Sequence, residues 1–149
     1  MKPEMAAYEI TEVLTKKIYE QSHQFIFINY ANADMVGHTG NIEASVKAIK
    51  VLDDCISKIA KAVTDQQDYL IITSDHGNIE QKINPQTGEI STEHTLNPVP
   101  FILIGQEYQG RATKVQTGIL ADVAPTILSL LNIEKPGEMT GRNLLEELH

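Results

Sequence analysis

Three short, almost wholly apolar segments divide the sequence, at residues 24–30, 69–73 and 99–104. Their centres are rich in β-branched and aromatic side chains, which favours strands buried on both faces of a sheet. Residues 41–63 place apolar side chains along one stripe at helical spacing, which predicts a long amphipathic helix between the first two strands. A strand–helix–strand order with buried, parallel-type strands predicts a layered α/β fold.

The rest of the chain carries weaker but consistent signals. Residues 3–20 predict a helix because apolar side chains recur at helical spacing, and residues 122–131 predict another, with Pro125 tolerated in its first turn. Residues 75–98 form a long polar stretch, whose Pro-Gln-Thr-Gly portion predicts a turn such as the tip of a hairpin. Long irregular segments in compact domains are often functional. We find no linker or repeat, so residues 1–149 are expected to belong to one domain.

Charge and cysteine content exclude several classes of function. The formal net charge of −8 argues against a general nucleic-acid surface, which needs clustered Lys and Arg. The apolar runs are too short to span a bilayer, and no secretion signal opens the sequence. The single cysteine, Cys55, cannot form an internal disulfide and is expected to be a small buried hydrophobe. These features predict a cytoplasmic protein whose partners are neither nucleic acids nor membranes.

Aspartate and histidine side chains follow the first two predicted strands. Asp34 and His38 are four residues apart, so one helical turn would bring both to the same side. Asp75 and His76 directly follow the second strand, where an irregular loop lets both turn towards one site, and His94 precedes the third. Because ligands gather at the carboxyl ends of strands in open α/β sheets, we expect these five side chains to converge.

This set of donors indicates metal chemistry. Aspartate oxygen and histidine nitrogen suit zinc or manganese, and the absence of cysteine pairs disfavours a structural zinc finger. Two divalent ions can clamp a phosphoryl group and activate an attacking oxygen. The residues therefore predict metal-assisted phosphoryl transfer or hydrolysis.

The other histidines and the serines give no comparable signal. His23 precedes a predicted strand and is expected on the surface or in a turn, and His149 is terminal. Ser74 and Ser91 are the serines nearest the predicted ligands, but serines at strand ends and turns more often hydrogen-bond the local backbone. The sequence therefore predicts metal ligands but indicates no nucleophile.

Longer motifs resemble one known family, the bacterial cofactor-independent (2,3-bisphosphoglycerate-independent) phosphoglycerate mutases of the alkaline phosphatase superfamily. The matching stretches occur in the family's order over nearly the whole chain, and they are residues 3–9 (PEMAAYE), 32–40 (NADMVGHTG), 75–78 (DHGN), 94–100 (HTLNPVP), 120–126 (LADVAPT) and 139–141 (MTG). The resemblance identifies the chain as similar to the carboxy-terminal part of such an enzyme.

The resemblance implies both a fold and an activity. The fold is a three-layer α/β/α sandwich of the alkaline phosphatase type, of which this chain would lack part of the sheet. The activity is the interconversion of 3-phosphoglycerate and 2-phosphoglycerate through a phosphoserine intermediate, with two manganese ions, or zinc or cobalt in some relatives. By resemblance, Asp34, His38 and His94 hold the ion next to the substrate phosphate, and Asp75 and His76 hold the ion that activates the serine.

The sequence also departs from the family. The nucleophilic serine of the family lies in a Gly-Asn-Ser-Glu-Val-Gly-His type of motif, and nothing in this chain matches it. That serine and one further Asp ligand are therefore expected from a missing amino-terminal segment, and the chain alone is expected to bind metal weakly and to be inactive. Two alternatives remain open: another phosphotransferase or phosphatase of the superfamily, or a non-catalytic remnant that acts as a binding or structural module.

Overall fold

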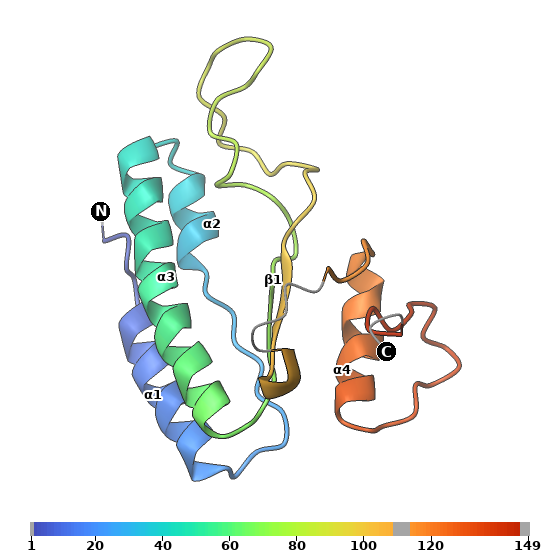
Figure 1. The fold of residues 1–149 in the computed structure, drawn as a ribbon. Coiled ribbons are helices and arrows are strands. Elements are labelled where there is room, and N and C mark those ends of the chain that lie inside the picture. Colours follow the sequence, from blue (N-terminus) through green and yellow to red (C-terminus); the bar gives the residue numbers. More distant parts are fainter. Residues whose placement is uncertain (1, 109–113, 147–149) are drawn as a thin grey trace. The chain divides into compact units, whose positions relative to one another are not determined.

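The computed structural model of the protein describes residues 2–108 and 114–146 (Figure 1). His149, which the sequence places at the carboxyl end, lies outside the described residues. The chain divides into two compact units, Met1–Gly105 and Gln106–His149. All five predicted metal ligands belong to the first unit.

The described part of the first unit contains three α-helices. They are α1 (Ala7–Glu20), α2 (Asn32–Gly37) and α3 (Ile42–Asp65), and both α1 and α2 pack against α3 (Figure 1). Apolar side chains from α1 and α3 form a buried cluster, in which burial of each leucine, isoleucine or valine contributes on the order of 1.5–3 kcal/mol. Its members are Leu14, Ile18, Ile59, Ala62 and Val63.

The predicted helices are confirmed, with small shifts at their ends. The Oδ1 atom of Asn41 accepts a hydrogen bond from the amide of Ala44 at 2.9 Å, so Asn41 caps α3 as its position predicts. The first helix begins at Ala7 rather than at Pro3, because the preceding residues form a turn in which Met5 has a φ of 45°.

The sheet contains two strands, β1 (Leu70–Thr73) and β2 (Phe101–Ile104), at two of the three predicted positions. Leu70 pairs with Ile104 and Thr73 with Phe101 in an antiparallel register. The expectation of parallel strands was wrong for this pair. The segment between β1 and β2 turns back on itself without a crossover helix, so the second strand enters in the opposite direction.

The prediction of a strand at residues 24–30 was also wrong. This segment forms no strand, and Phe25 and Phe27 are 53% and 76% exposed. Ile26 and Tyr30, by contrast, pack against the cluster between α1 and α3. The apolar run is therefore buried along one side only, because no described strand pairs with its backbone and no described layer covers its other side.

The segment between the two strands is a long hairpin-like loop, which Figure 1 shows projecting beyond β1 and β2. Isolated bridges pair Gly77 with Thr95 and Ile83 with Ile90 in antiparallel fashion. At the tip, the amide of Asn84 donates to the carbonyl of Glu89 at 2.8 Å, which confirms the predicted turn. The first bridge joins the outgoing and returning limbs on the side of the strands, and the second joins them next to the tip.

The second unit contains η1 (Gln106–Tyr108), η2 (Leu120–Asp122) and α4 (Val123–Leu130), so the predicted helix at residues 122–131 is confirmed. The buried carboxylate of Asp122 accepts hydrogen bonds from the amides of Ile119 and Arg142, at 2.8 and 2.9 Å. These bonds lower the pKa of Asp122 and tie the chain after α4 to the start of the helix.

The described elements confirm the α/β class, with three α-helices and two strands in the first unit. The further strands expected of a three-layer sandwich are not found between residues 2–108 or 114–146. No helix in the described part of the chain combines the length and apolar character that crossing a bilayer requires.

Candidate metal centre

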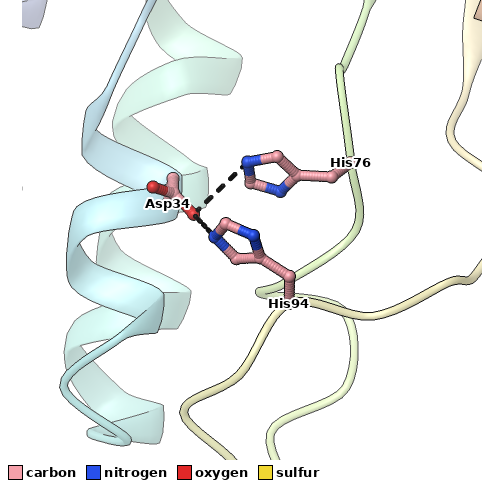
Figure 2. Close-up of side chains that lie close together, drawn as sticks. All are labelled: Asp34, His76 and His94. Carbon is pink, nitrogen blue, oxygen red and sulfur yellow. Dashed lines mark ion pairs between the residues drawn. The ribbon is translucent and has the colours of Figure 1, made fainter.

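Three separate segments of the first unit bring the predicted ligands together. Asp34 lies on α2, and His38 follows at its carboxyl end, where its amide donates to the carbonyl of Asp34 at 3.1 Å. Asp75 and His76 lie on the outgoing limb of the hairpin-like loop after β1, and His94 lies on its returning limb. Figure 2 shows the side chains of Asp34, His76 and His94 pointing towards one another from these segments.

One carboxylate oxygen, Oδ1 of Asp34, faces three imidazole rings. The Nε2 atoms of His94, His38 and His76 lie 3.2, 3.3 and 4.0 Å from it. The Nε2 atoms of His38 and His94 are 3.0 Å apart, and the rings of His76 and His94 stack with centroids 3.7 Å apart. One possible ligand atom from each of Asp34, His76 and His94 lies within 4.8 Å of the other two.

Backbone carbonyls orient two of the three rings. The Nδ1 atom of His38 lies 2.7 Å from the carbonyl oxygen of Thr92, and Nδ1 of His76 lies 3.3 Å from that of Gly77. A carbonyl can only accept, so we assign the ring proton to Nδ1 in both residues. In a neutral ring this leaves the lone pair of Nε2 directed at the cluster, which is the usual arrangement of metal-binding histidines.

The donor atoms fit a divalent cation. Lone pairs of imidazole nitrogens and an anionic oxygen repel one another at these separations unless a proton or a cation lies among them. Nitrogen and oxygen donors of this kind suit zinc and similar first-row ions.

Asp75 stands apart from this close group. Its side chain is 79% exposed, and its Oδ1 atom lies 3.7 Å from Nε2 of His76. The structure therefore brings four of the five predicted ligands into one tight cluster and places the fifth at its edge. The assignment of these side chains to particular ions stays a prediction.

Residues 1–135 match the family model described as the metalloenzyme superfamily. The chain belongs to the metalloenzyme superfamily. This membership and the donor set together imply divalent metal ions, without specifying the element.

Relatives of this metalloenzyme chain include two bacterial proteins named 2,3-bisphosphoglycerate-independent phosphoglycerate mutase. The protein from Clostridioides difficile is 48% identical over 147 residues, covering 99% of this chain and 29% of the relative. The protein from Ehrlichia ruminantium (strain Gardel) is 54% identical over 144 residues, covering 97% of this chain and 28% of the relative. The chain therefore spans little more than a quarter of the length of these relatives.

A solved structure supports the same relationship. A phosphoglycerate mutase from Leishmania mexicana, determined at low cobalt concentration, matches with a TM-score of 0.82 and 29% sequence identity. The match covers 95% of this chain and 28% of the solved one. These comparisons confirm the resemblance to part of a cofactor-independent phosphoglycerate mutase.

The electrostatics of the cluster favour an ionised Asp34 in this superfamily member. Partial burial by itself raises the pKa of Asp34, but a hydrogen bond from Asn78 and the nearby rings of His38, His76 and His94 outweigh it, so the pKa is lowered overall. A carboxylate that stays charged is the form that binds a cation.

Asn78 is a site residue that the sequence did not single out. Its side chain is 4% exposed, and Nδ2 donates to Oδ1 of Asp34 at 2.7 Å. It belongs to the Asp-His-Gly-Asn run after β1, so its place in that motif was the available signal.

Glu80 links the two limbs of the loop that carry His76 and His94. Its carboxylate accepts hydrogen bonds from the amide of Asn78 at 2.7 Å, from Nδ2 of Asn97 at 2.9 Å and from the hydroxyl of Thr95. Burial opposes ionisation, but these hydrogen bonds prevail and lower the pKa of Glu80 to about 2. The network fixes the limb that carries His76 against the limb that carries His94.

Two glycines allow these close approaches. A Cβ atom on Gly37 would lie 2.5 Å from Oδ1 of Asn78, and one on Gly77 would collide with the hydroxyl of Thr95. Gly37 therefore makes room for the Asn78 amide. Ser74 donates to the carbonyl of His76 at 2.8 Å, so it bonds the local backbone as predicted.

Proposed function

We propose that this chain is the carboxy-terminal part of a cofactor-independent phosphoglycerate mutase, which interconverts 3-phosphoglycerate and 2-phosphoglycerate. The observation that carries the proposal is the convergence of Asp34, His38, His76 and His94 in a chain closely related to enzymes of that name. Manganese is the proposed ion, and zinc or cobalt would suit the same donors.

Within this proposal the five side chains divide between two ions. Asp34, His38 and His94 hold one, and Asp75 and His76 hold the other, in keeping with the exposed position of Asp75 at the edge of the cluster. When bound, such ions neutralise the charge of a transferring phosphoryl group and activate the attacking oxygen. The residues of this chain hold and orient the ions, with His38 and His76 fixed by carbonyls.

Two ions need more donors than these five residues supply. The proposal therefore assigns one Asp ligand and the nucleophilic serine to the part of the relatives that this chain does not span. The partner of the chain is accordingly a complementing amino-terminal segment, and phosphoglycerate is the substrate of the combined enzyme. A role in glycolysis and a cytoplasmic location belong to the same proposal, the latter because Cys55 has no cysteine partner within the chain.

Calorimetric titration with Mn²⁺ tests the metal site. We expect weak binding by the unaltered chain and none by Asp34→Ala, because the oxygen that faces three imidazoles is lost. Asp53→Ala is the matched control, since Asp53 is an exposed carboxylate on α3 and its removal changes the net charge equally. Equal loss of binding in both variants would show that only overall charge matters.

An activity assay tests the assignment of the nucleophile. We expect no conversion of 3-phosphoglycerate by this chain alone, and conversion once a complementing amino-terminal segment of a relative is added. Turnover by the chain alone would contradict the proposal that the serine comes from elsewhere. Manganese binding without any turnover in the complemented mixture would favour a non-catalytic module.

A further inference from the structure

Lys82 is buried beside the candidate metal centre. It is 7% exposed, although lysine is among the residues least often buried in proteins. Its Nζ atom donates to the carbonyl of Gly37 at 3.2 Å and, over a short distance, to Oδ1 of Asn78. Among residues 2–108 and 114–146, no carboxylate lies within ion-pair distance of this ammonium group. Its contacts are therefore with an amide and a backbone carbonyl rather than with a counter-ion.

The contact with Asn78 decides which way that amide faces. The two ends of an asparagine amide have nearly the same shape, but one accepts hydrogen bonds and the other donates them. An ammonium group can only donate, so Lys82 selects the oxygen end and leaves Nδ2 directed at Oδ1 of Asp34. The reverse orientation would place the amide oxygen against the carboxylate, which is repulsive.

The groups around Asn78 leave its side chain little freedom to adopt another orientation. The amide of Asn78 lies against Gly37, where even a Cβ atom would come within 2.5 Å of Oδ1. The backbone amide of Asn78 is held by Glu80, and Nδ2 also approaches the carbonyl of Asp34 at 3.4 Å. Lys82 and Gly37 thus confine one end of the side chain, and Asp34 receives the other.

We infer that Lys82 is a positioning residue for the candidate metal centre: its ammonium group fixes the Asn78 amide so that the amide donates to the metal-binding oxygen of Asp34. The inference deepens the proposed function and rests on it for the role of Asp34. A buried positive charge by itself repels a cation, so charge repulsion alone predicts tighter metal binding when Lys82 is removed. Positioning through Asn78 predicts weaker binding. The net effect of removing Lys82 therefore distinguishes positioning from simple charge repulsion.

Nuclear magnetic resonance of the metal-free chain tests the orientation of Asn78 directly. The side-chain amide signal of Asn78 is assigned by its absence in Asn78→Ala. In Lys82→Met we expect its protons to exchange with water on the order of tenfold faster, the factor expected from loss of one hydrogen bond. Lys47→Met, which removes an exposed lysine from α3, should leave the signal unchanged. An unchanged signal in Lys82→Met would overturn the inference.

Cobalt binding, followed by the visible absorption of the bound ion, tests the consequence for the metal. We expect Lys82→Met to weaken binding about 10- to 100-fold, the range for loss of an outer partner of a metal ligand. The double variant with Asn78→Ala should bind no more weakly than Asn78→Ala alone, because Lys82 acts through Asn78. Tighter binding by Lys82→Met, or fully additive losses, would overturn the inference.

Lys82→Gln keeps the test decisive if Lys82→Met folds poorly, which circular dichroism would show. Glutamine retains an N–H donor for Asn78 and lacks the positive charge, so it should recover a large part of the cobalt affinity and a wild-type-like absorption spectrum. No recovery in a folded Lys82→Gln chain would contradict positioning by hydrogen bonding. Absence of cobalt binding by the unaltered chain would refute the proposed function, while the exchange rates of Asn78 would still decide the role of Lys82.

Discussion

The Oδ1 atom of Asp34 combines a negative charge, three facing imidazoles and one amide donor. Asn78 donates to the same oxygen that faces His38, His76 and His94. An oxygen with this many neighbours is held in place before any ion arrives, which lowers the conformational cost of binding. The geometry of the candidate metal centre therefore depends on the hydrogen bond from Asn78 to Asp34 as well as on the Asp and His side chains themselves.

The convergence of the Asp and His side chains was predictable from the sequence, and the contacts of Asn78 and Lys82 around them were not. Asp and His after a buried apolar run are informative because few other chemistries use them together. Lys82 in a polar loop is indistinguishable by sequence from a solvated surface lysine. Its burial follows from the fold of the 75–98 segment over α2, which local sequence patterns do not encode.

Acid should loosen the loop through Glu80. Because the pKa of Glu80 falls from an ordinary 4.5 to about 2 in the folded chain, its contribution to stability is present above pH 4.5 and is lost as the pH falls towards 2. We expect Glu80→Gln to flatten the fall in unfolding free energy across that window, measured by urea titration at several pH values. Glu89→Gln, an exposed glutamate on the same loop, should leave the slope unchanged, and an identical slope in Glu80→Gln would refute the prediction.

A methyl group on Gly37 should disturb the candidate metal centre by displacing Asn78. In Gly37→Ala, better helix propensity gains about 1 kcal/mol, but crowding against Asn78 costs about 1–3 kcal/mol, so we expect a net loss of stability. Metal affinity should fall as well, because the Asn78 amide must move away from Asp34. Thermal unfolding and Mn²⁺ titration measure both effects. Gly137→Ala is the control, since its Cβ atom would meet nothing within 4 Å.

At the scale of elements, periodicity was reliable where burial follows one face of a helix. α3 lies close to its predicted bounds because its stripe packs on α1 and α2, and Asn41 caps it. An apolar run such as residues 24–30 predicts burial but does not indicate which element packs against it. Where no described strand pairs with it, the run stays extended and exposes part of its apolar surface.

Substitution of Phe27 distinguishes the two interpretations of that segment. Phe27 is largely exposed, so we expect Phe27→Ser to change the free energy of unfolding by about 0.5 kcal/mol or less. Ile59→Ala, in the buried cluster of α3, should cost about 2–5 kcal/mol. Chemical denaturation compares the two variants. A loss of several kcal/mol in Phe27→Ser would mean that residues 24–30 form a buried strand after all.

At the scale of the whole molecule, the centre is built entirely within the unit Met1–Gly105. Its candidate ligands come from α2 and from both limbs of one loop, so a bound ion would link segments far apart in the sequence. A ligand that binds only the folded chain stabilises it by about 2.7 kcal/mol at a concentration of 100 times its dissociation constant. We expect Mn²⁺ to raise the melting temperature of the chain and to leave that of Asp34→Ala unchanged. Equal increases in both proteins would place the stabilising ion elsewhere.

The overall class and the convergence of the candidate ligands followed from the sequence because short apolar strands and Asp and His residues in the loops after them are local patterns. The antiparallel pairing of β1 and β2 did not, because strand direction depends on how the long loop returns. The number of strands in the sheet likewise depends on which parts of the fold are present, and the chain spans little more than a quarter of its relatives.

In the proposed enzyme, carboxylate and imidazole groups from α2 and the loop share bound cations. Anomalous X-ray scattering from crystals of the chain with its complementing segment, grown with Mn²⁺, tests it most directly. We expect a peak about 2.0–2.3 Å from Oδ1 of Asp34 and from Nε2 of His38 and His94. A peak bound by other residues, or none at saturating Mn²⁺, would contradict it.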